Sequence, residues 1–245
     1  MNVLEFHNQF NLGYNNILGP GAPGLNTYEI SVYLTNAQEE IVRELYSGKI
    51  NKVGFENTER NRRALNELVE NYKTSAIVPS TRNITEESRF YELPNNLMFI
   101  VNETIVLKSK DSCLNGKVVV VKPITHDEFT TSYKNPFRKP NKNKAWRLDI
   151  SKERSLTTVE IISEIDISEY RVRYIKYPNP IIISDLTTDP ELVGLGLTIN
   201  NQTAVAECEL NSYLHQEILN RAIELAIVDY RENTLQTQIQ TNNRV

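Results

Sequence analysis

The chain has 245 residues, a length that suits one large domain or two small ones with a buried core. Its 40% hydrophobic and 24% charged content, with a formal net charge of −4, excludes wholesale disorder. Glycine is scarce, with 9 residues, which disfavours folds that rely on several glycine-rich phosphate loops.

The N-terminal region, residues 1–78, is predicted to be helical. A short first helix leads into a loop rich in glycine and proline at residues 18–26. Apolar residues at helical spacing then predict a helix from residue 27, with Gly48 as its stop, and a second amphipathic helix over residues 58–72. We expect these two helices to pair as a hairpin.

The middle of the chain, residues 79–210, is predicted to be rich in β-structure. Short β-branched runs bounded by turn residues predict strands at residues 97–107, 117–124, 145–150, 157–163, 170–177, 181–184 and 203–209. Asn200 and Asn201 are typical of a turn before the last of these strands. We expect a central antiparallel β domain, either a sandwich or a barrel.

The C-terminal region is predicted to be a long helix over residues 211–232, which packs back on the core through its apolar stripe. Residues 233–245 form a polar tail that either frays or docks on a partner. Together these elements predict an α+β fold.

The start of the chain lacks the basic segment and apolar run of a secretory signal, and no apolar run approaches the roughly 20 residues that cross a bilayer. We therefore expect a cytosolic chain that does not contact a membrane. Cys113 and Cys208 are expected to be reduced, because a cytosolic chain of this size needs no disulfide.

Motifs of the common enzyme classes are missing from the sequence. Residues 19–24 match G-x-G-x-x-G, but two of them are prolines, which have no N–H for a pyrophosphate. There is no Walker A loop, G-x-S-x-G, H-E-x-x-H or C-x-x-C. His126 and His215 each have acidic neighbours, a pattern more typical of a helix surface than of a metal site. We expect no catalytic residue, no metal and no cofactor.

One segment has an unusual charge. Residues 129–148 contain six basic side chains and no acidic one, while the rest of the chain sums to −10. The candidate site residues lie in a basic loop at residues 134–147, and they are Lys134, Arg138, Lys139, Lys142, Lys144, Trp146 and Arg147. Such a loop docks on an acidic neighbouring copy, contacts phosphates, or is simply solvated while Trp146 anchors the next strand. The negative net charge favours a protein partner over nucleic acid.

Four stretches, taken together and in order, resemble virion structural proteins of crAss-like tailed bacteriophages. They are APGLNTYEISVYLTNAQEEIV (22–42), KNPFRKPNKNKAWRLD (134–149), YIKYPNPII (174–182) and CELNSYLHQEILNRAIELA (208–226). The resemblance implies a non-enzymatic, ring-forming protein of the neck or tail, present in many identical copies. It also implies contacts with the portal and with other neck or tail proteins, in a virion assembled in the host bacterial cytoplasm.

We therefore expect a structural subunit of a head-to-tail connector ring through which DNA passes. A ring subunit needs surfaces that reach the next copy, and the loop at residues 18–26, the basic loop and the tail at residues 234–245 are candidates. The alternative is a nucleic-acid-binding module that uses the basic loop at residues 134–147 for non-specific contact with DNA. A hydrolase acting through scattered carboxylates is a third, weaker hypothesis.

Overall fold

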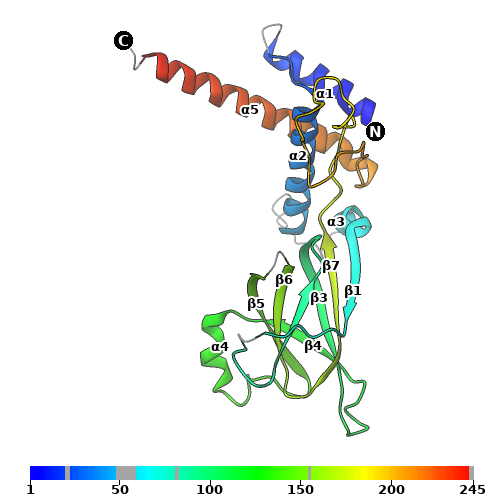
Figure 1. Ribbon diagram of the computed structural model, residues 1–245, viewed down its shortest axis with the longest axis vertical. Helices are drawn as coiled ribbons and strands as arrows, with labels where there is room; N and C mark the ends of the chain where they lie inside the picture. Colours follow the sequence, from blue (N-terminus) through cyan, green and yellow to red (C-terminus); the bar gives the residue numbers. More distant parts are fainter. Residues whose placement is uncertain (20–22, 48–58, 81–82, 154–155, 243–245) are drawn as a thin grey trace. The chain divides into compact units, whose positions relative to one another are not determined.

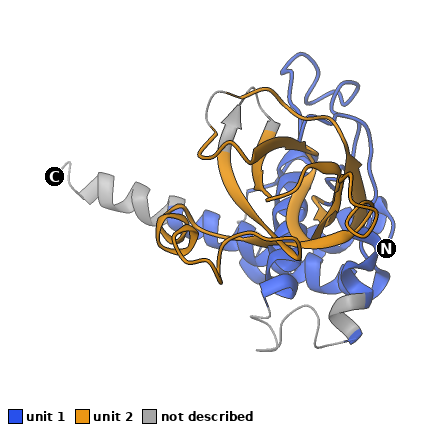
Figure 2. Cartoon of the chain, turned by 90° about the horizontal axis from the view of Figure 1, so that it is seen from below, with its two compact units in different colours: residues 1–68, 178–245 blue, residues 69–177 orange. Residues whose placement is uncertain are grey.

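The computed structural model describes residues 1–19, 23–47, 59–80, 83–153 and 156–242 (Figure 1). The chain divides into two compact units (Figure 2). Residues 1–68 and 178–245 form the helical unit, and residues 69–177 form the sheet unit. The divisions thus lie at 68 and 177 rather than at 78 and 210. The expected helix stop at Gly48, the helix start at residue 58 and the centre of the loop at 18–26 lie outside the described residues.

The helical unit contains α1 (Val3–Leu18), α2 (Thr27–Ser47), α3 (Glu59–Leu65), the 3-10 turns η1 (Asn66–Leu68) and η2 (Ser212–Leu214), and α5 (His215–Asn242). A capping box formed by Asn2 and Glu5 starts α1. Both α1 and α2 pack on α5, whereas α3 is only seven residues long. The expected hairpin between the helix at residue 27 and a long helix over 58–72 is therefore wrong, because α5 is the main partner of α2.

The buried face of α2 carries polar side chains among its apolar ones, and these bind the chain just after residue 177. Ser31 and Thr35 accept hydrogen bonds from the backbone N–H groups of Ile183 and Ile181, at 3.0 and 3.1 Å. Gln38 donates to the carbonyl of Asn179 at 2.7 Å. The expected strand at residues 181–184 is absent because its backbone groups bond to helix side chains, apart from one bridge to Ala206.

The segment at residues 185–210 is irregular, so the expected strand at 203–209 is also wrong. The predicted turn is confirmed, since Asn200 and Asn201 have φ values of 48° and 64° and join a bridge between Ile199 and Gln202. A small core lies beneath this segment, and its buried members are Ile182, Leu186, Leu192 and Ile199. The two bridges in this part of the chain, Ile182 with Ala206 and Ile199 with Gln202, are isolated, so neither is extended into a strand.

The C-terminal helix α5 is longer than expected. It continues to Asn242, through most of the segment predicted as a polar tail, while residues 243–245 lie outside the described residues. No proline or glycine occurs between residues 215 and 242, so nothing in the sequence stops the helix once it has formed.

The sheet unit is one curled sheet of seven strands. They are β1 (Val69–Thr74), β2 (Ser88–Leu93), β3 (Leu97–Leu107), β4 (Val118–Pro123), β5 (Lys144–Glu153), β6 (Leu156–Ile162) and β7 (Ile167–Lys176). Their order is β1-β7-β3-β4-β5-β6-β2, and all neighbours are antiparallel except β4 and β5. A bridge between Val78, just after β1, and Phe90 in β2 joins the two ends of the sheet. The strands thus wrap around a common core in the manner of a barrel, not a sandwich (Figure 2).

The expected α+β fold is confirmed, with N-terminal helices, a β-rich middle and a C-terminal helix (Figure 1). Three further elements differ from the expectation. Residues 69–74 form β1 rather than the end of a helix, because pairing with β7 outweighs helical periodicity. The strand β2 and the helix α4 (His126–Tyr133) were not predicted. Thr125 caps α4 by accepting a hydrogen bond from the N–H of Glu128.

Two apolar clusters hold the sheet unit together. The inner face of the sheet forms the main one, from members such as Tyr91, Ile105, Val159, Ile161 and Val172. The second lies on the opposite face, where Phe129 of α4 packs on Trp146 and Leu148 of β5 and on Ile162 of β6. Thus α4 covers the outer face of β5 and β6.

Candidate functional site

The structure separates the seven candidate residues into two groups. Lys134, Arg138, Lys139 and Lys142 are exposed on the segment between α4 and β5, and Lys144 is half-buried at the start of β5. Trp146 and Arg147 are buried, at 2% and 9% exposure. The segment at residues 134–144 is therefore the accessible part of the predicted loop, and we refer to it below as the basic loop.

Asparagine side chains give the basic loop an ordered shape. Asn135 accepts a hydrogen bond from the N–H of Phe137 at 3.0 Å, and Asn141 accepts one from the N–H of Asn143 at 2.9 Å. Lys117 donates to the side-chain oxygen of Asn143 at 2.6 Å, which ties the loop to the chain before β4. These hydrogen bonds fix the backbone from which the cationic side chains of the loop project.

Phe137 is the most exposed large apolar residue among the described residues, at 91% exposure. It lies beside Arg138 and Lys139, whose N–H groups both bond to the carbonyl of Asn135 at 3.0 Å. Full burial of such a ring contributes about 1.5–3 kcal/mol. Because aromatic residues and arginine are enriched in the centres of protein interfaces, Phe137 beside Arg138 is a candidate anchor.

Trp146 is a packing residue. Its ring meets Phe129 edge-on at a centroid distance of 6.2 Å, and the ammonium of Lys144 lies 5.7 Å from its centroid. Because α4 covers it, Trp146 is not part of a contact surface in this chain. The interpretation in which Trp146 anchors the following strand fits its position.

Arg147 also lies inside the sheet unit, on the face opposite Trp146. Its guanidinium bonds to a carboxylate oxygen of Glu103, and Tyr170 donates to the other oxygen at 2.8 Å. Burial is the main cause that raises the pKa of Glu103. Burial, reinforced by Glu103, also raises the pKa of the Tyr170 hydroxyl. The surface role expected of Arg147 does not fit its position, because its guanidinium is buried and pairs with Glu103 and with Asp149.

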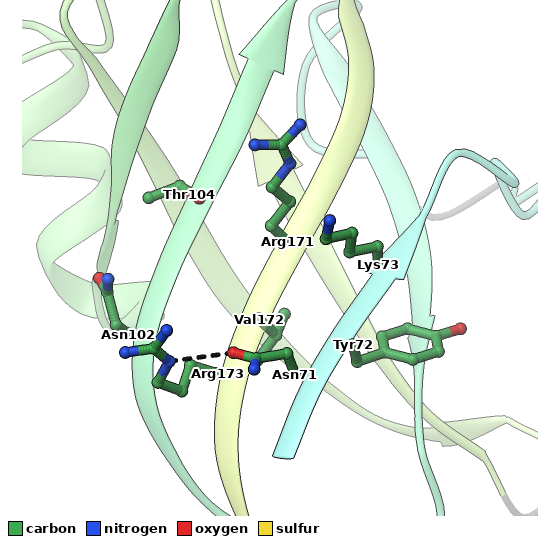
Figure 3. A pocket seen from close by; sticks show the side chains of 8 residues that line it. All are labelled: Asn71, Tyr72, Lys73, Asn102, Thr104, Arg171, Val172 and Arg173. Atoms are coloured by element: carbon green, nitrogen blue, oxygen red, sulfur yellow. Dashed lines mark hydrogen bonds between the residues drawn. The ribbon is translucent and has the colours of Figure 1, made fainter. Parts of the chain in front are cut away.

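A second basic surface was not predicted from the sequence. A groove of about 480 Å³ lies over β1, β7 and β3 (Figure 3). Its lining residues are Asn71, Tyr72, Lys73, Asn102, Thr104, Arg171, Val172 and Arg173. Arg171 and Arg173 alternate with buried residues along β7, a strand pattern that could have revealed them.

Strand register brings the polar side chains of the groove together. Arg173 lies between Asn71 and Asn102 across the three strands, and Arg171 lies between Lys73 and Thr104. Arg173 donates to Asn71 at 2.9 Å, as the dashed line in Figure 3 shows. Arg171 instead bonds to the carboxylate of Glu169 at 2.6 Å. Lys73 and Arg173 are therefore the basic side chains of the groove whose charge is least neutralised by a carboxylate.

His215, which was expected to be an ordinary residue of a helix, is buried in the core, where its ring makes a hydrogen bond. His215 is 7% exposed, and its Nε2 lies 2.9 Å from the carbonyl of Leu210. Burial lowers the pKa of His215. Within the described ranges, no group of three or more His, Cys, Asp or Glu side chains is placed to hold a metal ion.

Cys113 and Cys208 are both free. None of the helices in the described parts of the chain combines the length and apolar character needed to span a membrane.

Comparisons with known proteins identify relatives over nearly the whole chain. Residues 1–238 match a family model described as phage tail ring protein 3/4. Ring protein 3 of Bacteroides phage crAss001 is 40% identical over 213 residues, which cover 86% of this chain and 88% of that protein. Ring protein 4/5 of the same phage is 38% identical over 250 residues, which cover 100% of this chain and 99% of that protein. These matches confirm the resemblance to crAss-like phage virion proteins.

Proposed function

Because the chain belongs to the phage tail ring protein 3/4 family, and is thus a structural ring subunit of the virion, we propose a specific place for it. It forms a closed ring of identical copies in the head-to-tail region, next to the portal or other neck proteins, and DNA passes through the ring. The subunit is non-enzymatic and is assembled in the host cytoplasm.

The observation that carries this proposal is the ordered basic loop with its exposed Phe137. A closed ring needs a surface on each copy that binds a different surface on the next copy. The basic loop supplies one such surface, because it combines an apolar anchor with five exposed or half-buried cations on a chain whose remaining charge is negative.

The experiment neutralises Arg138, Lys139, Lys142 and Lys144 together by substitution with glutamine. We expect the purified variant to lose ring assembly, measured by native mass and negative-stain images, and particles that carry it to lose DNA retention. Neutralising Lys108 and Lys110, two exposed lysines in another loop, is the control and leaves assembly intact. Unchanged assembly and DNA retention in the fourfold variant would remove the loop from the proposal.

A nucleic-acid-binding module is the second candidate, and the groove over β1, β7 and β3 favours it. Lys73 and Arg173 stand on neighbouring strands, and Asn71 and Asn102 flank Arg173, an arrangement of cations and amides that fits phosphate oxygens. Under this alternative, the isolated chain binds DNA with an affinity that falls steeply as salt rises, since phosphate contacts release counterions. Substitution of Lys73 and Arg173 by glutamine then weakens binding and flattens the salt dependence.

A further inference from the structure

The helical unit contains a segment whose charge is the reverse of the basic loop. Residues 178–214 include five acidic side chains and no lysine or arginine. The basic loop has five cations and no acidic residue. One chain therefore carries two oppositely charged segments, and they belong to different units.

The acidic segment also exposes apolar side chains on a fixed turn. Leu195 is 63% exposed and Val193 is 58% exposed. Gly194 and Gly196, on either side of Leu195, have φ values of 86° and 62°, which glycine adopts without strain. The N–H of Leu195 bonds to the carbonyl of Leu192 at 3.2 Å, and Leu192 is buried in the small core. The turn thus holds Leu195 outward.

A neighbouring stretch adds to this surface. Ala206 packs against the same small core as Leu192, and on either side of it Val205 and Glu207 are exposed. Glu191, at the start of the glycine turn, is exposed as well. We call these five residues, Glu191, Val193, Leu195, Val205 and Glu207, the acidic pad. The pad offers apolar side chains with acidic ones beside them, which complements an aromatic ring with cations beside it.

We propose that the basic loop of one copy docks on the acidic pad of the next copy, and that this contact closes the ring. The inference rests on the proposed function and adds the partner surface to it. Phe137 packs on Leu195 and Val193, while Arg138 and Lys139 face Glu191 and Glu207. Because loop and pad are different surfaces, the contact runs head to tail and allows every copy to use both.

Charge reversal tests this pairing between copies. One variant carries Arg138→Glu and Lys139→Glu, so that the two loop positions that face the pad are acidic, as the pad is. The other carries Glu191→Lys and Glu207→Lys, so that loop and pad are both basic. Each variant alone is expected to associate about tenfold or more weakly than the parent chain, because like charges meet at every contact. An equimolar mixture recovers rings, because residues 138 and 139 of each copy can then face residues 191 and 207 of opposite charge on the next copy.

Matched controls reverse exposed charges elsewhere. The variants Lys108→Glu with Lys110→Glu, and Glu86→Lys with Glu87→Lys, alter similar exposed pairs in the sheet unit and are expected to assemble as the parent chain does. Circular dichroism and unfolding curves establish that all four variants fold. Native mass and negative-stain images then report assembly for each variant and for the mixture.

The outcomes separate the inference from the proposed function. Recovery in the mixture alone supports docking of loop on pad between copies. If the parent chain forms rings and both single-surface variants do so equally well, the inference is overturned while the proposed function stands. If both variants fail and their mixture also fails, the pairing of these two surfaces is wrong. A parent chain that stays monomeric, alone and with neck proteins, overturns both.

Discussion

Arg147 on β5 forms a buried ion pair with Glu103 on β3, and Tyr170 on β7 completes the pair with a 2.8 Å hydrogen bond to the same carboxylate. The side chains of Glu103 and Arg147 are 4% and 10% exposed. Three strands of the curled sheet are therefore linked by one polar cluster inside an otherwise apolar core. Glu103 is the shared partner, so the buried Tyr170 hydroxyl and the buried Arg147 guanidinium both depend on its carboxylate.

The first prediction concerns this cluster. Arg147→Leu is expected to lower the free energy of unfolding by about 3–5 kcal/mol, because the Glu103 charge is left buried and unpaired. Replacing all three residues, as Glu103→Leu, Tyr170→Phe and Arg147→Met, recovers most of that loss. Urea unfolding curves measure both variants. Arg138→Leu, on the surface, should change stability by no more than about 0.5 kcal/mol, and a similarly small effect of Arg147→Leu would show that the cluster contributes little.

The second prediction concerns pH. Arg221 of α5 binds Glu40 of α2 through two hydrogen bonds, at 2.7 and 2.9 Å, and these lower the pKa of Glu40 below its ordinary 4.5. A lowered carboxyl pKa adds stability that is fully present above the ordinary value and is lost as pH falls through the lowered one. Glu40→Gln should therefore be less stable than the parent chain at about pH 7, and the difference should shrink as the pH falls below the ordinary carboxyl pKa and through the lowered pKa of Glu40.

The comparison between Glu40→Gln and the parent chain needs urea unfolding at a series of pH values. A stability difference that persists unchanged at low pH would contradict the ionic origin of the contribution. Glu232→Gln, at an exposed acid on α5, serves as the matched control for the loss of one negative charge.

The third prediction uses the only tryptophan of the chain as a probe. Trp146 is 2% exposed beneath α4, so its emission in the folded chain should be blue-shifted and poorly quenched by iodide. Phe129→Ala removes the ring that packs on Trp146 and should cost about 3 kcal/mol. The same substitution should increase quenching. Strong quenching in the parent chain would argue against the position of α4.

The fourth prediction concerns the polar face of α2. Thr35→Val keeps the shape of the side chain but removes the acceptor of the Ile181 N–H, which is buried. A buried donor without a partner costs about 1–3 kcal/mol. Asn36→Ala, on the exposed side of the same helix, should have little effect. Thermal unfolding of the two variants distinguishes them, and equal melting temperatures would refute the role of Thr35.

Sequence periodicity located most elements because their patterns are local. The strand predicted at residues 97–107 coincides with β3, and the apolar spacing from residue 27 marks α2. Periodicity failed where a distant partner decides the conformation. Residues 69–74 pair with β7, and residues 181–183 bond to side chains of α2, so neither follows its local preference.

The candidate site was predicted only in part for a similar reason. Charge along the sequence identified the basic loop, because its cations lie within eleven residues that contain no acid. It did not separate Lys142, which faces solvent, from Arg147, whose partner Glu103 lies 44 positions away. It also missed Lys73 and Arg173, since strand pairing alone brings them to one groove.

Native mass spectrometry of the purified chain, alone and with portal and neck proteins, tests the central claim most directly. The account predicts a closed assembly at an integer multiple of the 28.2 kDa chain, seen as a ring in negative stain. A 28.2 kDa monomer under both conditions would contradict it.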